Sequence, residues 1–201
     1  MIPNAVDVPP AAAYVPGSEP LRMLFVGRFA FNKGLDLLIA VARRLEREGR
    51  AGAVRFELAG DGPLLAAIKA EGVPQNVVLL GRVDDDRLFQ LYTECDAFVL
   101  PTRFEGMPTV VLEAMARCRP IIVSDVGATA ELVDATNGHL LPSGDADALY
   151  DAINAFIASS PAERSAMGAA SYARCAGQFA WPAVTGRFVE LFEEVVVRKA
   201  K

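Results

Sequence analysis

Two glutamates, Glu105 and Glu113, stand eight residues apart where a loop gives way to a helical pattern. The apolar run 97–100 before them predicts a strand that ends in this loop. A strand, a loop and a helix N-terminus in this order are where open α/β sheets bind ligands. The unpaired N–H groups of Thr109 and Val110 would favour a phosphate, and Glu113 could accept hydrogen bonds from sugar hydroxyls beside it. A purely structural role for both glutamates stays open on spacing alone, because carboxylates also complement the helix dipole.

Basic residues follow the first predicted strand. Arg28 comes directly after Gly27, and Lys33 stands five residues further on, where a helix opens. Gly27 allows a close backbone approach, and the two cations could bind a diphosphate, Arg28 through its planar guanidinium and Lys33 as a point charge. On residue type alone, both could equally be solvated surface charges.

The second and third predicted strands also end in residues that could meet a ligand. Gly60 lies in a strand-to-helix turn that lacks the G-K-[ST] of a P-loop and the G-x-G-x-x-G of a dinucleotide site. A purely structural turn is equally open there. Val83 follows the third strand, and either a plain strand end or a main-chain contact to a ligand fits that position.

Several tracts occur in an order that resembles the retaining GT-B glycosyltransferases of the family 4 (group 1) type. They are an I-P-N tract at 2–4, G-R-x-x-x-x-K-G at 27–34, G-D-G-P at 60–63 and E-x7-E at 105–113. The resemblance implies that Arg28, Lys33 and Glu105 are catalytic, and that neither a cofactor nor a metal is used. It also implies a nucleotide-sugar site formed by residues from several loops: Gly27, Arg28, Lys33, Gly60, Val83, Glu105, Gly106, Met107, Thr109, Val110 and Glu113.

Within this set, the resemblance assigns the diphosphate to Arg28 and Lys33, and the base to the main chain of Val83. It assigns the ribose hydroxyls to Glu113 and the donor sugar to Glu105.

Two positions depart from the family pattern. Ala128 replaces the second glycine of a G-G-x-x-E turn at 127–131, so we expect a tighter backbone approach there. Pro108 replaces a glycine found in other members and has no N–H, which removes one main-chain donor for the sugar. Glu131 is expected to have a structural role, as an ion-pair partner or cap of its helix.

The composition excludes several kinds of protein. A net charge of −5 and a pI near 5.0 argue against nucleic acid as a partner. No apolar run approaches the roughly 20 residues that span a bilayer, and the N-terminus shows no signal peptide. We therefore expect a cytoplasmic protein without a transmembrane segment, with any membrane association made through a missing N-terminal domain.

The cysteines and the single histidine do not supply a zinc site. We expect the cysteines to be buried thiols in a reducing compartment, and His139 to be a structural histidine with its hydrogen bonds satisfied. The acidic run 84–86 precedes a helical pattern and is expected to cap a helix, with no role in metal binding.

Continuous apolar runs predict six buried strands, at 22–27, 54–59, 77–80, 97–100, 120–123 and 139–141. Helical periodicity lies between them and continues to the end of the chain, at 145–157, 161–175 and 181–197. This alternation predicts a Rossmann-like, doubly wound parallel α/β sheet with a C-terminal helical extension, one half of a GT-B fold. Residues 1–20 are expected to form a linker or arm from the domain junction, and residues 21–201 the nucleotide-sugar-binding domain.

The chain is too short for both halves of a GT-B enzyme, each of which needs at least about 100 residues. We therefore expect the acceptor domain in the same, longer chain, and no transfer by these residues alone.

The resemblance implies transfer of a sugar from a nucleoside-diphosphate sugar to an acceptor hydroxyl, with retention of the anomeric configuration. UDP, GDP and ADP donors are equally compatible with the sequence. A non-catalytic nucleotide-sugar sensor or scaffold domain is the main alternative; an epimerase or phosphorylase of the same architecture is another, although such epimerases need further acidic and histidine residues.

Overall fold

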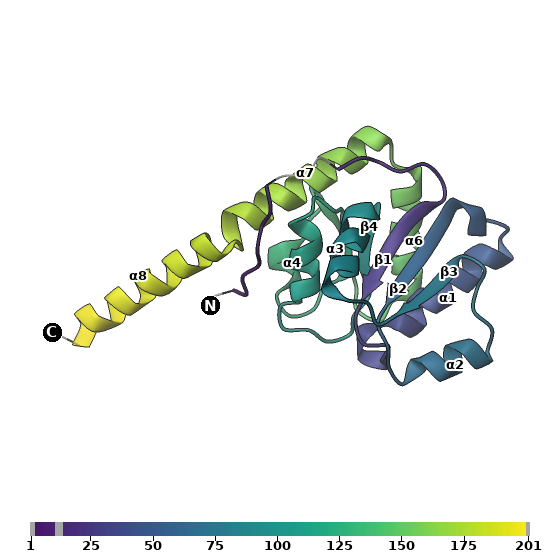
Figure 1. Cartoon of the computed structure of the whole chain (residues 1–201), viewed down its shortest axis with the longest axis horizontal. Helices are drawn as coiled ribbons and strands as arrows, with labels where there is room; N and C mark the ends of the chain where they lie inside the picture. Colours follow the sequence, from purple (N-terminus) through teal and green to yellow (C-terminus); the bar gives the residue numbers. More distant parts are fainter. Residues whose placement is uncertain (1–2, 11–13, 200–201) are drawn as a thin grey trace.

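The computed structural model of the chain describes residues 3–10 and 14–199, with side chains to residue 196, and its centre is a six-stranded sheet (Figure 1). All neighbouring strands are parallel, in the order β3-β2-β1-β4-β5-β6. The predicted Rossmann-like sheet is confirmed, and no strand boundary differs from its prediction by more than one residue. The strands are β1 (Leu21–Val26), β2 (Val54–Ala59), β3 (Val77–Gly81), β4 (Ala97–Leu100), β5 (Ile121–Ser124) and β6 (Gly138–Leu141).

Helices cover both faces of this sheet. Helix α1 contacts α2 and α6, whereas α4 contacts α7. Figure 1 shows α3 and α4 on the opposite side of the sheet from α1 and α6, which is the doubly wound arrangement. The helices are α1 (Leu35–Arg47), α2 (Leu64–Ala70), α3 (Asp85–Glu94), α4 (Thr109–Met115), α5 (Thr129–Leu132), α6 (Ala146–Ala158), α7 (Pro161–Gln178) and α8 (Trp181–Lys199).

The sequence explains most of these elements directly. Every residue of β4 and of β5 is buried, because helices cover both faces, and this is why their sequences are continuously apolar. Asp84 caps α3, since its carboxylate accepts the N–H of Arg87 at 2.8 Å, so the predicted helix cap is confirmed. The bounds of the four-residue α5, and the short 3-10 turns η1 (Phe31–Lys33) and η2 (Ala51–Ala53), were not predicted, because these segments are too short to show a periodic pattern.

The centre of the sheet is where the strand order reverses. Strands β1 and β2 share six paired positions, but β1 and β4 share only Met23 with Ala97 and Leu24 with Phe98. The chain leaves β1 in one direction along the sheet and reaches β4 on the other side. A crevice at the carboxyl ends of these two strands is the usual ligand position in such sheets.

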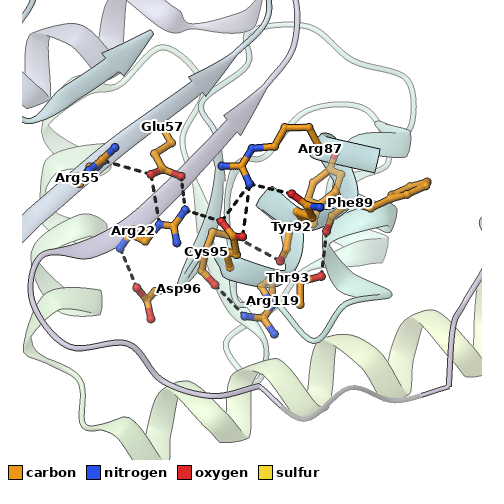
Figure 2. A network of polar contacts seen from close by, with 12 residues as sticks. Arg22, Arg55, Glu57, Arg87, Phe89, Tyr92, Thr93, Cys95, Asp96 and Arg119 are labelled. Atoms are coloured by element: carbon orange, nitrogen blue, oxygen red, sulfur yellow. Dashed lines mark hydrogen bonds and ion pairs between the residues drawn. The ribbon is translucent and has the colours of Figure 1, made fainter. Parts of the chain in front are cut away.

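Charged side chains near the start of β1 tie it to β2 and α3 (Figure 2). The Arg22 guanidinium contacts Glu57 at 3.0 Å and Glu94 at 2.9 Å, and Arg55 contacts Glu57 at 3.2 Å. Two arginines therefore neutralise the Glu57 carboxylate, which lies almost fully buried in the sheet. The charges of this cluster are paired with one another, so its role is structural.

The N-terminal segment packs along the domain. The buried Asp96 carboxylate accepts the N–H groups of Gly17 at 2.6 Å and Arg22 at 2.8 Å, and the hydroxyl of Tyr14 at 3.3 Å. Nearer the start, Val6 forms a β-bridge with Ala180. Residues 1–2 and 11–13 of the predicted linker lie outside the described residues.

Helix α8 extends away from the sheet beyond its first turns (Figure 1). Val184 is buried, but Trp181 is 53% exposed and Phe192 is 63% exposed. Within residues 3–10 and 14–199, no helix combines the length and the apolar character that crossing a membrane requires.

Candidate functional site

The predicted ligand residues all lie at the carboxyl edge of the sheet. Gly27 follows β1 and continues its ladder, donating its N–H to the Ala59 oxygen at 3.1 Å. Gly60 follows β2 and donates to the Gly81 oxygen at 2.8 Å. An open hollow of about 640 Å³ lies over these strand ends, lined by Gly27, Arg28, Gly60, Asp61, Gly62, Pro63 and Arg82.

Gly60 cannot carry a side chain in this arrangement. Its φ is +143°, and a Cβ there would lie 1.9 Å from the carbonyl oxygen of Gly27. The residues that follow β1 and β2, Gly27 and Gly60, therefore present no side chain to the hollow, which leaves room for a ligand close to the main chain.

Lys33 and Glu105 meet across the point where the strand order reverses. Lys33 ends the 3-10 turn after β1, Glu105 lies in the loop after β4, and the ammonium forms an ion pair with Oε1 of the carboxylate. The pair is mostly buried, with the Glu105 side chain 13% exposed and that of Lys33 25% exposed. The structure thus brings together one predicted phosphate ligand and the predicted sugar ligand.

The loop that carries Glu105 is docked on the turn that carries Lys33. The Arg103 N–H and the Thr102 hydroxyl both donate to the Asn32 oxygen at 2.8 Å. The Arg103 guanidinium also binds the Asp36 carboxylate through two nitrogens, at 2.7 and 2.8 Å. Arg103 is therefore engaged in holding the loop.

Arg28 is exposed at the edge of the hollow. Among the residues that the structure describes, its side chain forms no ion pair, so its guanidinium is available to a ligand. Val83 follows β3 directly after Arg82, which lines the hollow, and is half-buried. The structure places Val83 one strand further from Glu105 than Gly60, so these residues can share only an extended ligand.

Glu113 lies one turn inside α4 and is held by a residue that sequence reasoning missed. The Tyr92 hydroxyl donates to Oε2 of Glu113 at 2.8 Å, and Tyr92 itself is fully buried on α3. Burial and the nearby charge of Glu113 raise the pKa of Tyr92 well above its ordinary value, so this hydroxyl stays a donor. The contact leaves Oε1 of Glu113 for a ligand. Tyr92 has the spacing of a core residue, and no local pattern reveals its partner.

The first turn of α4 offers main-chain donors. Thr109 and Val110 begin the helix, and their N–H groups have no acceptor in a preceding turn. Pro108 precedes them as the N-cap and supplies neither a side-chain cap nor an N–H. Val111 donates to the Pro108 oxygen at 3.1 Å, so Thr109 and Val110 offer their N–H groups along the helix axis at this end.

The loop 105–107 rests on the turn after β5. Gly127 has φ +57°, and a Cβ there would lie 2.2 Å from the Glu105 oxygen and 2.4 Å from the Gly106 oxygen. Ala128 donates its N–H to Gly106 at 2.8 Å with a φ of −101°, which any residue can adopt. The close approach expected at Ala128 is thus made by Gly127.

A second hollow of about 620 Å³ lies beside this loop, lined by Pro3, Asn4, Gly106, Met107, Gly127, Ala128 and Glu131. Glu131 lies at its edge in α5 and is exposed. Its expected role as a cap or ion-pair partner is not found among the described residues, because Ala128 is the N-cap of α5 and Glu131 has no salt bridge there.

His139 and the cysteines lie away from these hollows. Burial lowers the pKa of His139, which favours its neutral form. Its Nε2 is buried without a hydrogen-bond partner in the described part of the chain, so the expectation of a histidine with its hydrogen bonds satisfied was wrong.

Cys95, Cys118 and Cys175 are free and buried, as predicted. Burial raises the pKa of Cys95 and Cys175 to about 12, which makes both thiols unreactive.

The comparisons with known proteins agree on one family. A family model described as "Glycosyl transferases group 1" matches residues 20–159. The chain is 32% identical over 140 residues to alpha-D-kanosaminyltransferase of Streptomyces kanamyceticus, covering 67% of this chain and 36% of that protein. It is 27% identical over 199 residues to glycogen synthase of Mycobacterium tuberculosis, covering 96% of this chain and 47% of that protein.

Solved structures share the fold. A Staphylococcus aureus TarM mutant in complex with UDP superposes with a TM-score of 0.80 at 20% identity, over 96% of this chain and 39% of TarM. Anabaena HepE in complex with UDP-glucose has a TM-score of 0.73 at 22% identity, over 87% of this chain and 49% of HepE. The chain spans about a third to a half of the length of the curated relatives that it matches.

Proposed function

The chain belongs to the glycosyl transferases group 1 family, and from this premise we propose that it binds a nucleoside-diphosphate sugar and forms the donor-binding part of a retaining glycosyltransferase. The contact between Lys33 and Glu105 carries the proposal. It joins a cation suited to phosphate and a carboxylate suited to sugar hydroxyls, one from each side of the strand-order reversal. In a nucleoside-diphosphate sugar, the sugar is bonded directly to the diphosphate, so adjacent groups of these two kinds suit such a donor.

Positive groups surround the proposed diphosphate position. Arg28 and Lys33 would bind the phosphate oxygens, together with the N–H groups of Thr109 and Val110. When the glycosidic bond breaks, the leaving diphosphate gains negative charge, and these donors would stabilise it electrostatically without a metal. In this proposal they are the main source of rate enhancement in this half of the enzyme.

The nucleoside and the sugar would lie on either side of the diphosphate. Glu113 would accept hydrogen bonds from the ribose hydroxyls through the oxygen that Tyr92 leaves free, and the main chain at Val83 would contact the base. Glu105, Gly106 and Met107 would face the sugar, with the Glu105 carboxylate stabilising positive charge at the anomeric carbon. The UDP and UDP-glucose bound in TarM and HepE support a donor of this chemical class.

Transfer also needs an acceptor hydroxyl. We propose that a second domain of the same enzyme binds it, and that the 201-residue chain binds the donor but does not transfer sugar. Transfer to any acceptor by the purified chain would contradict this division of roles.

A ligand-detected NMR panel of UDP, GDP and ADP sugars against the purified chain tests the donor proposal. We expect saturation transfer to one nucleotide class, unchanged by EDTA. Failure of all three classes to bind would overturn the proposal, and a large loss of affinity on adding EDTA would overturn its metal-free part.

Calorimetry on variants tests the assignment of residues. Glu113→Gln keeps the shape of the side chain but replaces charge-assisted bonds by neutral ones, so we expect a loss of about 1–2 kcal/mol, roughly five- to thirty-fold in nucleotide affinity. Arg28→Ala should cost at least as much for the diphosphate and little for the free nucleoside. Glu190→Gln on the exposed α8 is the matched control and should bind as wild type. Equal affinity of wild type and Glu113→Gln for every nucleotide would overturn the site.

A further inference from the structure

A residue near the N-terminus contacts the loop that carries Glu105. The side-chain amide of Asn4 donates to the Met107 oxygen at 2.9 Å, and the Asn4 main-chain N–H approaches the Met107 sulfur at 3.3 Å. The two residues are 103 positions apart in the chain. Asn4 therefore makes a two-point contact with one residue of the proposed sugar-binding loop.

The segment that carries Asn4 is fixed by contacts of its own. Val6 donates its N–H to the Phe179 oxygen at 2.9 Å and forms a β-bridge with Ala180. The Tyr172 hydroxyl donates to the Pro9 oxygen at 3.0 Å. Val6, two residues from Asn4, thus anchors Asn4 at the α7–α8 junction, independently of the loop that Asn4 touches. The Tyr172 contact holds the segment further along, at Pro9, and is not needed for that anchor.

The loop itself has few other restraints at this point. Gly106 is exposed and has no side chain, and a Cβ there would meet nothing within 4 Å. On the other side, Ala128 holds the Gly106 oxygen at 2.8 Å. The Met107 oxygen is held by Asn4, so the carbonyl groups of Gly106 and Met107 are each fixed by a different segment that lines the second hollow.

We propose that Asn4 is a positioning residue that sets the conformation of residues 105–107 and thereby the affinity for the sugar part of the donor. This inference rests on the proposed function, in which that loop faces the sugar. The diphosphate and nucleoside contacts come from other elements, so Asn4 should affect the sugar selectively.

The test compares Asn4→Ala with Tyr172→Phe, which removes the hydroxyl that holds Pro9 in the same segment but does not touch the loop. For each variant, calorimetry gives Kd for the nucleoside-diphosphate sugar found in the NMR panel and for the corresponding bare diphosphate. Losing one neutral hydrogen bond typically weakens binding by roughly two- to tenfold. We expect Asn4→Ala to lose about fivefold in affinity for the sugar donor, with Kd for the bare diphosphate within about twofold of wild type. Tyr172→Phe should bind both ligands as wild type.

A spectroscopic measurement tests the contact without any ligand. In the chain labelled with ¹³C-methyl methionine, Asn4→Ala should move the Met107 methyl signal, which Met107→Leu assigns, and Tyr172→Phe should leave it in place. An unmoved signal in Asn4→Ala would overturn the inference.

The binding outcomes separate the two proposals. A wild-type chain that binds no nucleoside-diphosphate sugar overturns the proposed function, and this inference with it. If wild type binds the donor, three results overturn the inference alone: wild-type affinity of Asn4→Ala for both ligands, an equal loss for both, or the same selective loss in Tyr172→Phe.

Discussion

At the scale of single residues, the hydroxyl of Tyr92 determines how Glu113 is presented. It donates to one carboxylate oxygen at 2.8 Å from a fully buried position. A carboxylate with one oxygen already bonded has fewer rotamers available, so a ligand that binds the other oxygen meets a partly preorganised group. Glu113 therefore acts with Tyr92 as a unit.

Tyr92→Phe tests this unit. The ring and its packing remain, but Glu113 loses its donor, and we expect nucleoside affinity to fall by about 0.5–1.5 kcal/mol, roughly two- to tenfold. Calorimetry with the free nucleoside gives the result. Tyr150→Phe is the matched control, because its hydroxyl also donates to a glutamate, Glu48, on the other side of the molecule. Equal losses in the two variants would contradict a specific role for Tyr92.

The ion pair between Lys33 and Glu105 predicts a competition. The Lys33 ammonium has three N–H donors and can hold a phosphate beside Glu105, but the two anions then share one cation and repel each other. Glu105→Gln therefore removes a competing negative charge. We expect this variant to bind the bare diphosphate about fivefold more tightly, because a like charge about 4 Å away costs roughly 1 kcal/mol even in bulk water. The sugar donor should bind more weakly, because Glu105 also contacts the sugar. Weaker binding of the bare diphosphate to Glu105→Gln, measured beside Glu190→Gln, would show that Glu105 does not compete for Lys33.

At the scale of elements, the turn after β5 supports the loop after β4. Gly127 packs against the main chain of Glu105 and Gly106 with no room for a Cβ. Two sheet elements that are adjacent in space thus fix the predicted sugar ligand, and a change in one should displace the other.

Gly127→Ala tests this support against Gly72→Ala. Both glycines have positive φ, +57° and +84°, so either substitution costs about 1–2 kcal/mol of backbone strain. A Cβ at Gly72 meets nothing within 4 Å, whereas one at Gly127 would overlap two carbonyl oxygens. We expect Gly127→Ala to lower Tm further than Gly72→Ala and to weaken sugar-donor binding. Equal effects of both variants on Tm and on affinity would mean that the turn does not support the loop.

The elements also show what the sequence could predict. The strands were predicted closely because burial on both faces leaves a continuous apolar run, as in β4. The positions of Glu105 and Lys33 at one edge followed from parallel strands, which end on the same side. Their direct contact, and those of Tyr92 with Glu113 and of Asn4 with Met107, join residues far apart in sequence. Such pairs depend on side-chain packing and leave no local pattern.

At the scale of the whole molecule, buried thiols couple stability to pH. Burial raises the pKa of Cys95 to about 12, whereas an unfolded cysteine titrates near 8.5. Between these values the folded chain keeps a proton that the unfolded chain loses. The free energy of unfolding therefore falls as pH rises above about 8.5, with a slope approaching 1.4 kcal/mol per pH unit from this thiol.

Cys95→Ala should reduce that alkaline slope, as measured by denaturant unfolding from pH 8 to pH 11. Val99→Ala, at another fully buried position of the same region, is the control. It should lose stability at every pH through its cavity while keeping the wild-type slope. An unchanged slope in Cys95→Ala would mean that this thiol titrates alike in both states.

The short pairing between β1 and β4 leaves few ladder hydrogen bonds in the middle of the sheet. We call the line between these two strands the seam. The ladder there has only two paired positions, against six between β1 and β2, and the loops that follow the strands supply the other contacts, such as the Lys33–Glu105 ion pair. Arg28 and Lys33 lie on one side of this seam, and Glu105 and Glu113 lie on the other. A bound donor would therefore act as a non-covalent cross-link between the two halves of the sheet. Hydrogen exchange should then show ligand-induced slowing that is larger at Met23, Leu24 and Phe98 than within β5 and β6. Uniform slowing throughout the sheet would mean that the donor stabilises the fold as a whole, with no additional effect on the β1–β4 seam.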